Sequence, residues 1–273
     1  MPDLAATMRS SPAPFDALAE AYDAQFTETL IGRAQRATVL GEFKGAFLPG
    51  TRVLEINCGT GVDAVYLGHQ GVQVLACDAS PAMIRVARRR LDTAALRATV
   101  EFRCLATENL GKLIGEAPFD GVLSNFAGLN CVEDLHGVAR DLARLLRPGA
   151  RALLCLFGRF CAWEVLWYLG RGQAGQAFRR FQSGAQIARL GKEASVEVRY
   201  PSARRVRQIF APQFRLRGWK GVGVAVPPTY AEGLARRFPR LLGGLELADK
   251  KLLARLPGAR ALGDHVLLEF ERV

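Results

Sequence analysis

Two glycines in a short turn and an aspartate further along have the spacing that most clearly indicates chemistry. The apolar run 53–57 leads into Gly59 and Gly61, and residues 62–69 have the pattern of a helix. A strand, a glycine turn and a helix N-terminus together form a nucleotide or anion site, because glycine lets the backbone approach a ligand. Asp78 ends the next apolar run, 19 residues after Gly59, where a ribose-binding acid is expected. The spacing therefore predicts a ligand that contains a nucleoside.

Two cofactors fit this turn. Gly59, Gly61 and Ala64 satisfy G-x-G-x-x-A, a permitted form of the dinucleotide fingerprint, which would make the protein an NAD(P)-dependent oxidoreductase. That activity also needs a catalytic Tyr/Lys or His set, and the sequence shows no obvious one. The other cofactor is S-adenosylmethionine. The glycine motif by itself does not decide between them.

Five ordered blocks resemble one family. They are V-L-E-I-N-C-G-T-G at 53–61, A-C-D-A-S-P-A-M-I at 76–84, A-T-E-N-L at 106–110, F-D-G-V-L-S-N-F at 119–126 and L-L-R-P-G-A at 145–150. Through these blocks the chain resembles the class I S-adenosylmethionine-dependent methyltransferases, and more closely those of quinone biosynthesis. The segment F-D-A-L-A-E-A-Y-D at 15–23 also looks like the entry segment of that family. The resemblance implies an α/β fold with a Rossmann-like, seven-stranded, mostly parallel sheet whose last strand is antiparallel, and with helices on both faces.

The resemblance also implies a role for individual residues. Asp78 is expected to accept hydrogen bonds from the ribose, and Glu55 to order the glycine turn or meet the amino group of the cofactor. The remaining expected cofactor-binding residues belong to the turn (Asn57, Cys58, Gly59, Gly61), to the adenine site (Ala79, Met83, Thr107, Glu108) and to the floor where cofactor and acceptor meet (Asn125, Phe126).

Two positions depart from the family pattern. The family usually has glycine where this chain has Asn57, and asparagine is the next most tolerant residue of left-handed backbone. The family often has an aspartate that meets the adenine amine at the position of Ala106. Here that contact is expected from the backbone, from Thr107 or from Glu108, or is missing.

Methyl transfer from a sulfonium mainly requires that the acceptor be aligned with the methyl group. A general base helps when the acceptor is a hydroxyl or a protonated amine, and the candidates are His265, Tyr22 and Glu164. Each also has a structural interpretation: a loop histidine bonded to backbone, a core aromatic, and a surface acid or arginine partner. Arg36 is a further candidate for contact with cofactor or acceptor, or else a surface charge. The sequence contains no Ser/His/Asp set, no paired catalytic carboxylates and no phosphate-cradling G-x-x-x-x-G-K-[ST] loop.

Composition places the chain among globular proteins. It has 273 residues, 49% of them hydrophobic, and no run of 18 apolar residues. Its six cysteines form no C-x-x-C pair, which favours buried free thiols in a reducing cytoplasm. Its three histidines lack metal-ligand spacing, so we expect no metal. Residues 1–14 contain three prolines and no secretory signal, and are expected to form a loose tail.

The excess positive charge is concentrated in one segment. The net charge is +11, and residues 159–220 hold 13 basic and 3 acidic groups. Three interpretations stay open: a solvated face, attraction of an acidic acceptor or anionic membrane, and nucleic acid. The aromatics lie mainly at 160–168 and the arginines mainly at 171–217, which favours an amphipathic surface over base stacking. An RNA methyltransferase is a further alternative, but the chain lacks an appended RNA-binding domain.

The apolar pattern alternates between strands and helices after residue 51, which predicts a parallel sheet. Expected strands are 53–57, 72–77, 100–104, 119–124, 152–157, 214–226 and 266–271. Expected helices are 15–26, 32–47, 62–69, 81–96, 132–146 and 201–210, with a short one near 109–114. Because ligands bind at the carboxyl ends of parallel strands, the motif residues should meet there.

We expect one methyltransferase domain over 1–273, with N-terminal helices at 1–48 and a cofactor-binding core at 51–158. Insertions at 159–200 and 227–263 should form helical caps after strands five and six. Trp163, Trp167 and Tyr168 are expected to bind a small acceptor that is hydrophobic and anionic, because they offer apolar surface with polar tips beside a basic segment. The alternative is that these aromatics complete the core. The sequence does not predict the oligomeric state.

Overall fold

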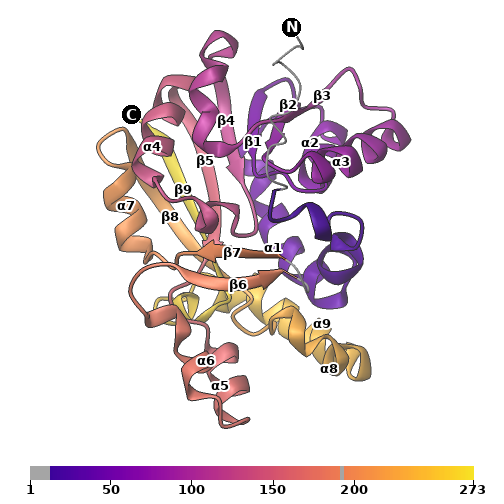
Figure 1. Ribbon diagram of the computed structural model, residues 1–273, viewed down its shortest axis with the longest axis vertical. Helices are drawn as coiled ribbons and strands as arrows, with labels where there is room; N and C mark the ends of the chain where they lie inside the picture. The colour runs from indigo at the N-terminus through magenta and orange to yellow at the C-terminus, as the bar shows by residue number, and fades with distance from the viewer. Residues whose placement is uncertain (1–12, 191–193) are drawn as a thin grey trace, which may run out of the picture.

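A seven-stranded sheet forms the centre of the computed structural model, which describes residues 13–190 and 194–273 (Figure 1). The strands are β1 (Arg52–Ile56), β2 (Gln73–Asp78), β3 (Val100–Cys104), β4 (Phe119–Ser124), β5 (Leu146–Phe157), β8 (Phe214–Val222) and β9 (His265–Arg272). They lie in the order β3-β2-β1-β4-β5-β9-β8, with β1 to β5 parallel. The last strand, β9, is antiparallel to both of its neighbours. The predicted fold is therefore confirmed.

Helices cover both faces of this sheet. The helices are α1 (Leu30–Ala46), α2 (Val62–His69) and α3 (Pro81–Ala94) on one face, and η3 (Thr107–Glu116), α4 (Leu135–Leu145) and α7 (Ala203–Phe210) on the other. Along β5, Leu153 and Cys155 pack in the core under α1, α2 and α3, while Leu154 and Leu156 pack in the core under η3, α4 and α7. A strand buried on both faces is apolar at consecutive positions, which explains its continuous hydrophobic run.

Side-chain caps fix several helix starts. The Ser80 hydroxyl accepts a hydrogen bond from the Met83 N–H at 3.1 Å, and Pro81 occupies the first turn of α3, as the Ser-Pro pair predicts. The Thr29 hydroxyl accepts the Gly32 N–H at the start of α1. These caps orient α1 and α3, which border the ligand-binding end of the sheet.

The insertion after β5 contains helices, as expected, and also a hairpin that the sequence analysis missed. Its elements are α5 (Ala162–Leu169), α6 (Ala174–Ala177), η5 (Arg179–Phe181), β6 (Gln186–Leu190) and β7 (Ala194–Val198). Along the hairpin Ala188, Leu190, Val196 and Val198 alternate with exposed residues, the period-2 pattern of strands. Figure 1 shows β6 and β7 lying across one end of the sheet, apart from it.

The second insertion follows β8 and is helical. It comprises η6 (Thr229–Ala231), α8 (Glu232–Arg237), α9 (Pro239–Ala248), η7 (Asp249–Leu253) and η8 (Ala259–Leu262). Ala235 and Leu242 pack against Ile31 and Ala34 of α1. In Figure 1, α5, α6, α8 and α9 all lie towards the same end of the molecule. None of the helices formed by the described residues is long and apolar enough to cross a bilayer.

The N-terminal segment contains two short helical turns in place of the predicted helix at 15–26. It forms η1 (Asp16–Leu18) and η2 (Asp23–Thr27), and η4 (Gly128–Cys131) is a similar short turn after β4. The part of the expected N-terminal segment before residue 13 lies outside the described residues. Short polar contacts fix this segment, because the Ser80 hydroxyl bonds to Asp16 and the Thr60 hydroxyl donates to Asp23 at 2.8 Å.

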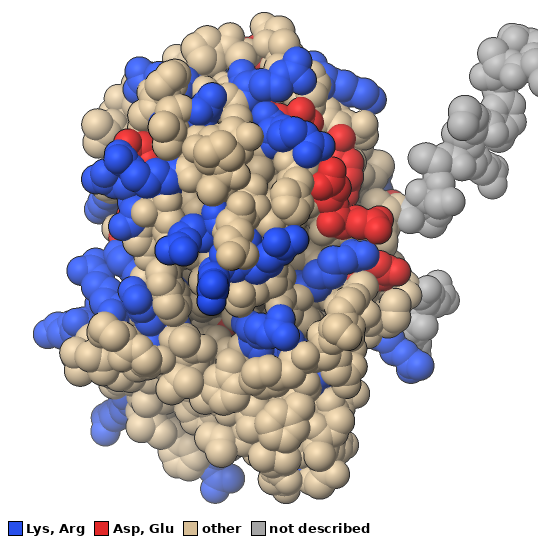
Figure 2. All heavy atoms as spheres, turned by 90° about the vertical axis from the view of Figure 1, so that its left-hand side faces the viewer, with Lys and Arg blue, Asp and Glu red and all other residues tan. Residues whose placement is uncertain are grey.

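The basic side chains of residues 159–220 lie largely on the outer surface. Figure 2 shows Lys and Arg spread across the face that carries α4 and α7. Contributors from the basic segment include Arg204, Arg205 and Arg207 on α7 and Arg215 and Arg217 on β8, all exposed. The excess charge therefore faces solvent at this sheet edge.

Candidate functional site

A cavity of about 530 Å³ lies where the carboxyl ends of β1, β2 and β4 meet the start of β9. All of the predicted cofactor residues line it except Gly61. The lining also includes residues from the N-terminal segment (Pro14, Phe15, Tyr22, Phe26), from α1 and α2 (Arg36, Val62, Asp63), from the loop after β4 (Ala127, Gly128, Cys131, Val132), from the hairpin (Ala188, Leu190, Val196, Val198), and Thr60, Phe157, Thr229, Asp264 and His265. Gly61 instead has φ +75° at the start of α2, where an added Cβ would meet the Phe102 ring at 2.5 Å.

Asp78 holds the glycine turn against the end of β2. Its Oδ2 accepts the Gly59 N–H at 2.9 Å and its Oδ1 accepts the Ser80 N–H at 2.8 Å. Burial raises the pKa of Asp78, and the two backbone donors oppose that shift. Each carboxylate oxygen has a further lone pair, so Asp78 can still accept a hydrogen bond from a ligand hydroxyl.

Asn57 adopts the left-handed backbone that the family usually assigns to glycine, with φ +56°. Its side chain adds contacts that glycine lacks. The Asn57 Oδ1 accepts the Thr107 hydroxyl at 2.7 Å, and its Nδ2 donates to the Ser124 hydroxyl at 3.4 Å. The asparagine thus ties the end of β1 to η3 and to the end of β4, and it engages the hydroxyl of Thr107 in this structure.

Arg36, Asp63, Asn125 and Glu55 form a polar group at the other end of the turn. Arg36 is paired with Asp63 Oδ1, and Asn125 Nδ2 donates to Asp63 Oδ2 at 2.8 Å. The Arg36 Nε and Glu55 Oε2 are buried atoms without a hydrogen-bond partner. Burial raises the pKa of Glu55 well above its usual range, and Asp63 adds to the shift. A ligand with a carboxylate and an ammonium group, such as an amino acid, would supply both missing partners.

The sequence analysis missed Asp63. It occupies the first turn of α2, two residues after Gly61, and its carboxylate holds both Arg36 and Asn125. An acid in the first turn of the helix that follows a glycine turn was the available signal, because acids are favoured there.

The three base candidates have different environments. Tyr22 lines the cavity, but burial raises the pKa of its phenol to about 12, so near neutral pH it is a hydrogen-bond donor. Glu164 is 1% exposed and does not line the cavity, and its oxygens accept from Arg179 and Arg180. It is therefore an arginine partner. His265 lines the cavity and can accept a proton.

His265 is held between aromatic rings. Its imidazole stacks on the Phe157 ring at a centroid distance of 4.7 Å and meets the Phe126 ring edge-on at 5.5 Å. Its Nδ1 lies 3.4 Å from Asp264 Oδ2. Burial lowers the pKa of His265, the Asp264 carboxylate opposes that shift, and Arg180 adds to it. The imidazole is thus neutral at pH 7, as a general base must be. The sequence analysis did not single out Asp264, whose position beside His265 was its one signal.

The three aromatics that the sequence assigned to the acceptor do not line the cavity. The Trp163 Nε1 donates to the Ala225 carbonyl at 3.0 Å, and Trp167 and Tyr168 lie 4.9 and 6.0 Å from the Tyr230 ring. Because α5 turns these side chains towards the second insertion, they complete the packing between the two insertions. The unpredicted hairpin instead contributes apolar side chains to the cavity lining. Within residues 13–190 and 194–273, no group of three or more His, Cys, Asp or Glu side chains is placed to hold a metal ion.

The comparison with protein families agrees with this geometry. Residues 53–149 match the family model described as a methyltransferase domain. The match covers about a third of the chain, and together with the strand order and the glycine turn it supports a methyltransferase core at 53–149 with S-adenosylmethionine as its cofactor. The match favours S-adenosylmethionine over the dinucleotide, the two cofactors that the glycine motif left open.

The relatives include quinone-biosynthesis methyltransferases. A demethylmenaquinone methyltransferase from Clavibacter sepedonicus is 34% identical over 145 residues, which cover 53% of this chain and 57% of that protein. A ubiquinone biosynthesis O-methyltransferase from Methylocella silvestris is 33% identical over 150 residues, which cover 52% and 56%. The chain thus spans a little over half the length of the curated relatives it matches.

Solved structures are similar to this chain over more of its length than the family model is. A putative S-adenosylmethionine-dependent methyltransferase from Listeria monocytogenes superposes with a TM-score of 0.58 at 16% identity, over 87% of this chain and 97% of that one. At this identity the likeness concerns the fold, including the parts outside the matched residues 53–149.

Proposed function

We propose that this protein transfers a methyl group from S-adenosylmethionine to a hydroxyl or amine of a small, apolar molecule. One observation carries the proposal: a single cavity holds the predicted cofactor residues other than Gly61 and a buried neutral imidazole beneath an apolar hairpin. The relatives named demethylmenaquinone methyltransferase and ubiquinone biosynthesis O-methyltransferase support a small-molecule acceptor.

The cofactor supplies an electrophilic methyl group on its sulfonium. In this proposal Asp78 receives the ribose hydroxyls, because its oxygens keep free lone pairs at the end of β2. Ala79 and Met83 flank the adenine. The unpartnered Arg36 Nε and Glu55 Oε2 receive the carboxylate and ammonium groups. Asn125, held by Asp63, lies with Phe126 on the floor between cofactor and acceptor.

The acceptor is proposed to bind under the β6–β7 hairpin. Ala188, Leu190, Val196 and Val198 contribute apolar surface, and the Phe157 ring continues it. Among the described residues that line the cavity, Arg36 is the one Lys or Arg, and it is paired with Asp63. The basic segment therefore gives no support for an anionic group on the buried part of the acceptor, and we propose an apolar acceptor.

His265 is proposed as the general base. Its neutral imidazole can take the proton of an acceptor hydroxyl or ammonium, and Nε2 is the ring nitrogen on the side away from the Nδ1–Asp264 contact. Stacking on Phe157 and the edge contact with Phe126 fix the plane of the ring. Tyr22, which keeps its proton, can donate a hydrogen bond to cofactor or acceptor.

Methyl transfer from labelled S-adenosylmethionine to a panel of apolar phenols, catechols and amines tests the proposal. His265→Gln should reduce transfer by about 10²–10⁴-fold, as expected for loss of a general base, while affinity for S-adenosylhomocysteine stays near the parent value. His136→Gln is the matched control, because His136 is exposed on α4. Parent-level transfer by the His265 variant would overturn the assignment of the base, and no transfer to any panel member by the parent protein would overturn the acceptor class.

Peripheral contact with an anionic membrane is also proposed, at the end of the molecule formed by α5, α8 and α9 (Figure 1). Large apolar side chains are exposed there: Leu166 and Leu169 on α5, Leu234 on α8, Leu241 on α9, and Phe238 between them. Exposed Arg236, Arg237 and Arg240 lie beside them and complement anionic headgroups. Such a contact would suit an acceptor drawn from a lipid surface.

Vesicle sedimentation tests this contact. The parent protein should sediment with vesicles that contain phosphatidylglycerol and much less with phosphatidylcholine alone, and Leu234→Ser/Leu241→Ser should reduce sedimentation. Leu48→Ser is the control, because Leu48 is 59% exposed and lies just after α1. Equal sedimentation of parent and double variant would contradict the assignment. We also propose a cytoplasmic location, which the free thiols of all six cysteines support.

A further inference from the structure

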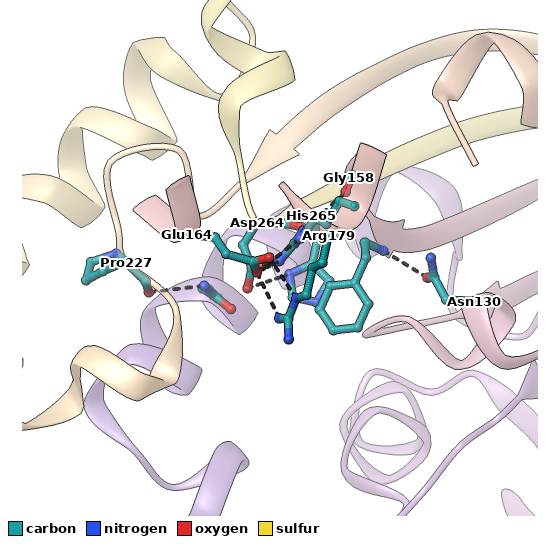
Figure 3. A network of polar contacts seen from close by, with 10 residues as sticks. Asn130, Gly158, Glu164, Arg179, Pro227, Asp264 and His265 are labelled. Atoms are coloured by element: carbon teal, nitrogen blue, oxygen red, sulfur yellow. Dashed lines mark hydrogen bonds and ion pairs between the residues drawn. The ribbon is translucent and has the colours of Figure 1, made fainter. Parts of the chain in front are cut away.

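A buried arginine joins the insertion after β5 to the base. Arg180 is 4% exposed and lies in η5, between α5 and the hairpin. Its Nη2 donates to Asp264 Oδ1 at 2.6 Å and to Glu164 Oε2 at 2.7 Å. Its Nη1 donates to the backbone carbonyls of Asp264 at 2.8 Å and Gly158 at 3.2 Å. Figure 3 shows this network beside His265.

Asp264 divides its carboxylate between the arginine and the histidine. Oδ1 accepts from Arg180, and Oδ2 faces His265 Nδ1 at 3.4 Å. Arg180 also holds the Asp264 carbonyl, so it fixes both the side chain and the main chain of the residue that precedes His265. The position of the carboxylate that faces the imidazole therefore depends on a side chain that the insertion supplies.

We propose that Arg180 is a positioning residue that, through Asp264, sets the orientation and the proton affinity of His265, so that the base is complete only when the insertion after β5 is seated. The inference rests on the proposed function in one respect, that His265 accepts the proton of the acceptor. It assigns no direct contact between Arg180 and the substrate.

The charges around His265 give the direction of the effect. Asp264 faces it directly, and Arg180 compensates that carboxylate from η5. Glu164 of α5 shares Arg180 with Asp264 and also binds Arg179. On the other side, beyond Phe126, Arg36 of α1 is paired with Asp63 of α2.

Removal of Arg180 would leave the Asp264 carboxylate uncompensated beside the imidazole. A neighbouring negative charge favours the protonated imidazole, so the pKa of His265 should rise. A larger fraction of the base would then carry a proton at the pH where it must accept one. Arg180 thus keeps His265 neutral while it holds the Asp264 carboxylate beside the imidazole.

Histidine titration by NMR tests the proposal directly. The chain has three histidines, so His69→Gln and His136→Gln variants assign the His265 signal. Because Arg180→Gln leaves two buried acids without their partner, the double variant Arg180→Gln/Glu164→Gln removes one buried charge of each sign. In the double variant the pKa of His265 should rise by about one unit or more, a tenfold gain in proton affinity.

Two controls separate positioning from scaffolding. Glu164→Gln alone keeps Arg180 on Asp264 and should show no upward shift. Arg180→Lys keeps the charge and should restore most of the parent titration. If the double variant titrates as the parent does, Arg180 only supports the fold and the proposal is wrong. If the double variant does not fold, Arg180→Lys and Asp264→Asn remain as tests. Asp264→Asn should lower the pKa of His265. An unchanged pKa in Asp264→Asn would also refute the proposal.

The titration is independent of methyl transfer, because it needs neither cofactor nor acceptor. A shifted His265 signal together with no methyl transfer would support the positioning role and contradict the proposed function. An unshifted His265 signal together with methyl transfer that depends on His265 would contradict the positioning role and support the proposed function.

Discussion

Replacement of Trp167 by alanine should destabilise the protein and leave acceptor binding intact. The Trp167 ring packs on Tyr230 at 4.9 Å, and the Arg171 guanidinium lies 3.6 Å from its centroid. It belongs to the cluster formed by Ile31, Val226 and their neighbours, which joins the two insertions to α1. Because Trp167 does not line the cavity, its loss removes packing and no acceptor contact.

The size of the effect follows from the burial of the ring. A fully buried Trp→Ala change costs about 3–5 kcal/mol. Trp167 is half-buried, so we expect about 2 kcal/mol. For a chain of this size that loss corresponds to a fall of roughly 4–8 °C in Tm.

Thermal unfolding followed by circular dichroism, together with the KM for the acceptor, provides the assay. Val196→Ala is the matched comparison, because Val196 lines the cavity from the hairpin. It should raise the acceptor KM and lower Tm by less than the Trp167 variant does. If Trp167→Ala instead keeps the parent Tm and raises the acceptor KM, α5 contributes to the acceptor site and the assignment of the hairpin as the apolar wall is wrong.

Three further predictions concern the cofactor, pH and metal ions. Asp78→Ala should weaken S-adenosylhomocysteine binding by about 1–3 kcal/mol, or roughly 5–150-fold, because a buried acceptor is lost and the Gly59 and Ser80 N–H groups are freed; unchanged affinity in calorimetry would contradict this. The folded-state pKa of His265 lies below its ordinary value of 6.5, so the stability it contributes is present above pH 6.5 and is lost as the pH falls through the lowered pKa. Urea unfolding between pH 5 and 8 should therefore show a weaker pH dependence in His265→Gln, and an unchanged dependence would refute it. Turnover should be unaffected by EDTA; loss of activity that a divalent ion restores would show that a metal takes part.

The sheet and the meeting of the glycine turn with Asp78 were predictable because their signals are local. Strands buried on both faces give continuous apolar runs, and Ser80-Pro81 marks a helix start in the sequence. The glycine turn and Asp78 lie at the ends of adjacent strands, so their meeting follows from the order of the sheet. Asn57 also behaves as its residue type indicates, with left-handed backbone.

The surroundings of His265 and of the α5 aromatics were less predictable because they depend on contacts between distant segments. Arg180 and Asp264 are 84 positions apart, and no local pattern shows that their side chains meet. The aromatic residues of α5 indicated a buried face, but sequence does not tell which neighbour covers it. The hairpin had a partial signal, since apolar residues occupy every second position at 188–190 and at 194–198, but Ile187 and the charged residues 192–193 interrupt the alternation. The surrounding arginines and aromatics favoured a helical interpretation.

Titration calorimetry of the purified protein with S-adenosylhomocysteine, NAD and NADP tests the central claim most directly. The orphaned Arg36 Nε and Glu55 Oε2, together with Asp78 at the end of β2, predict binding of one S-adenosylhomocysteine per chain and none of either dinucleotide. Binding of NAD or NADP in place of S-adenosylhomocysteine, or no heat with any of the three, would contradict the account.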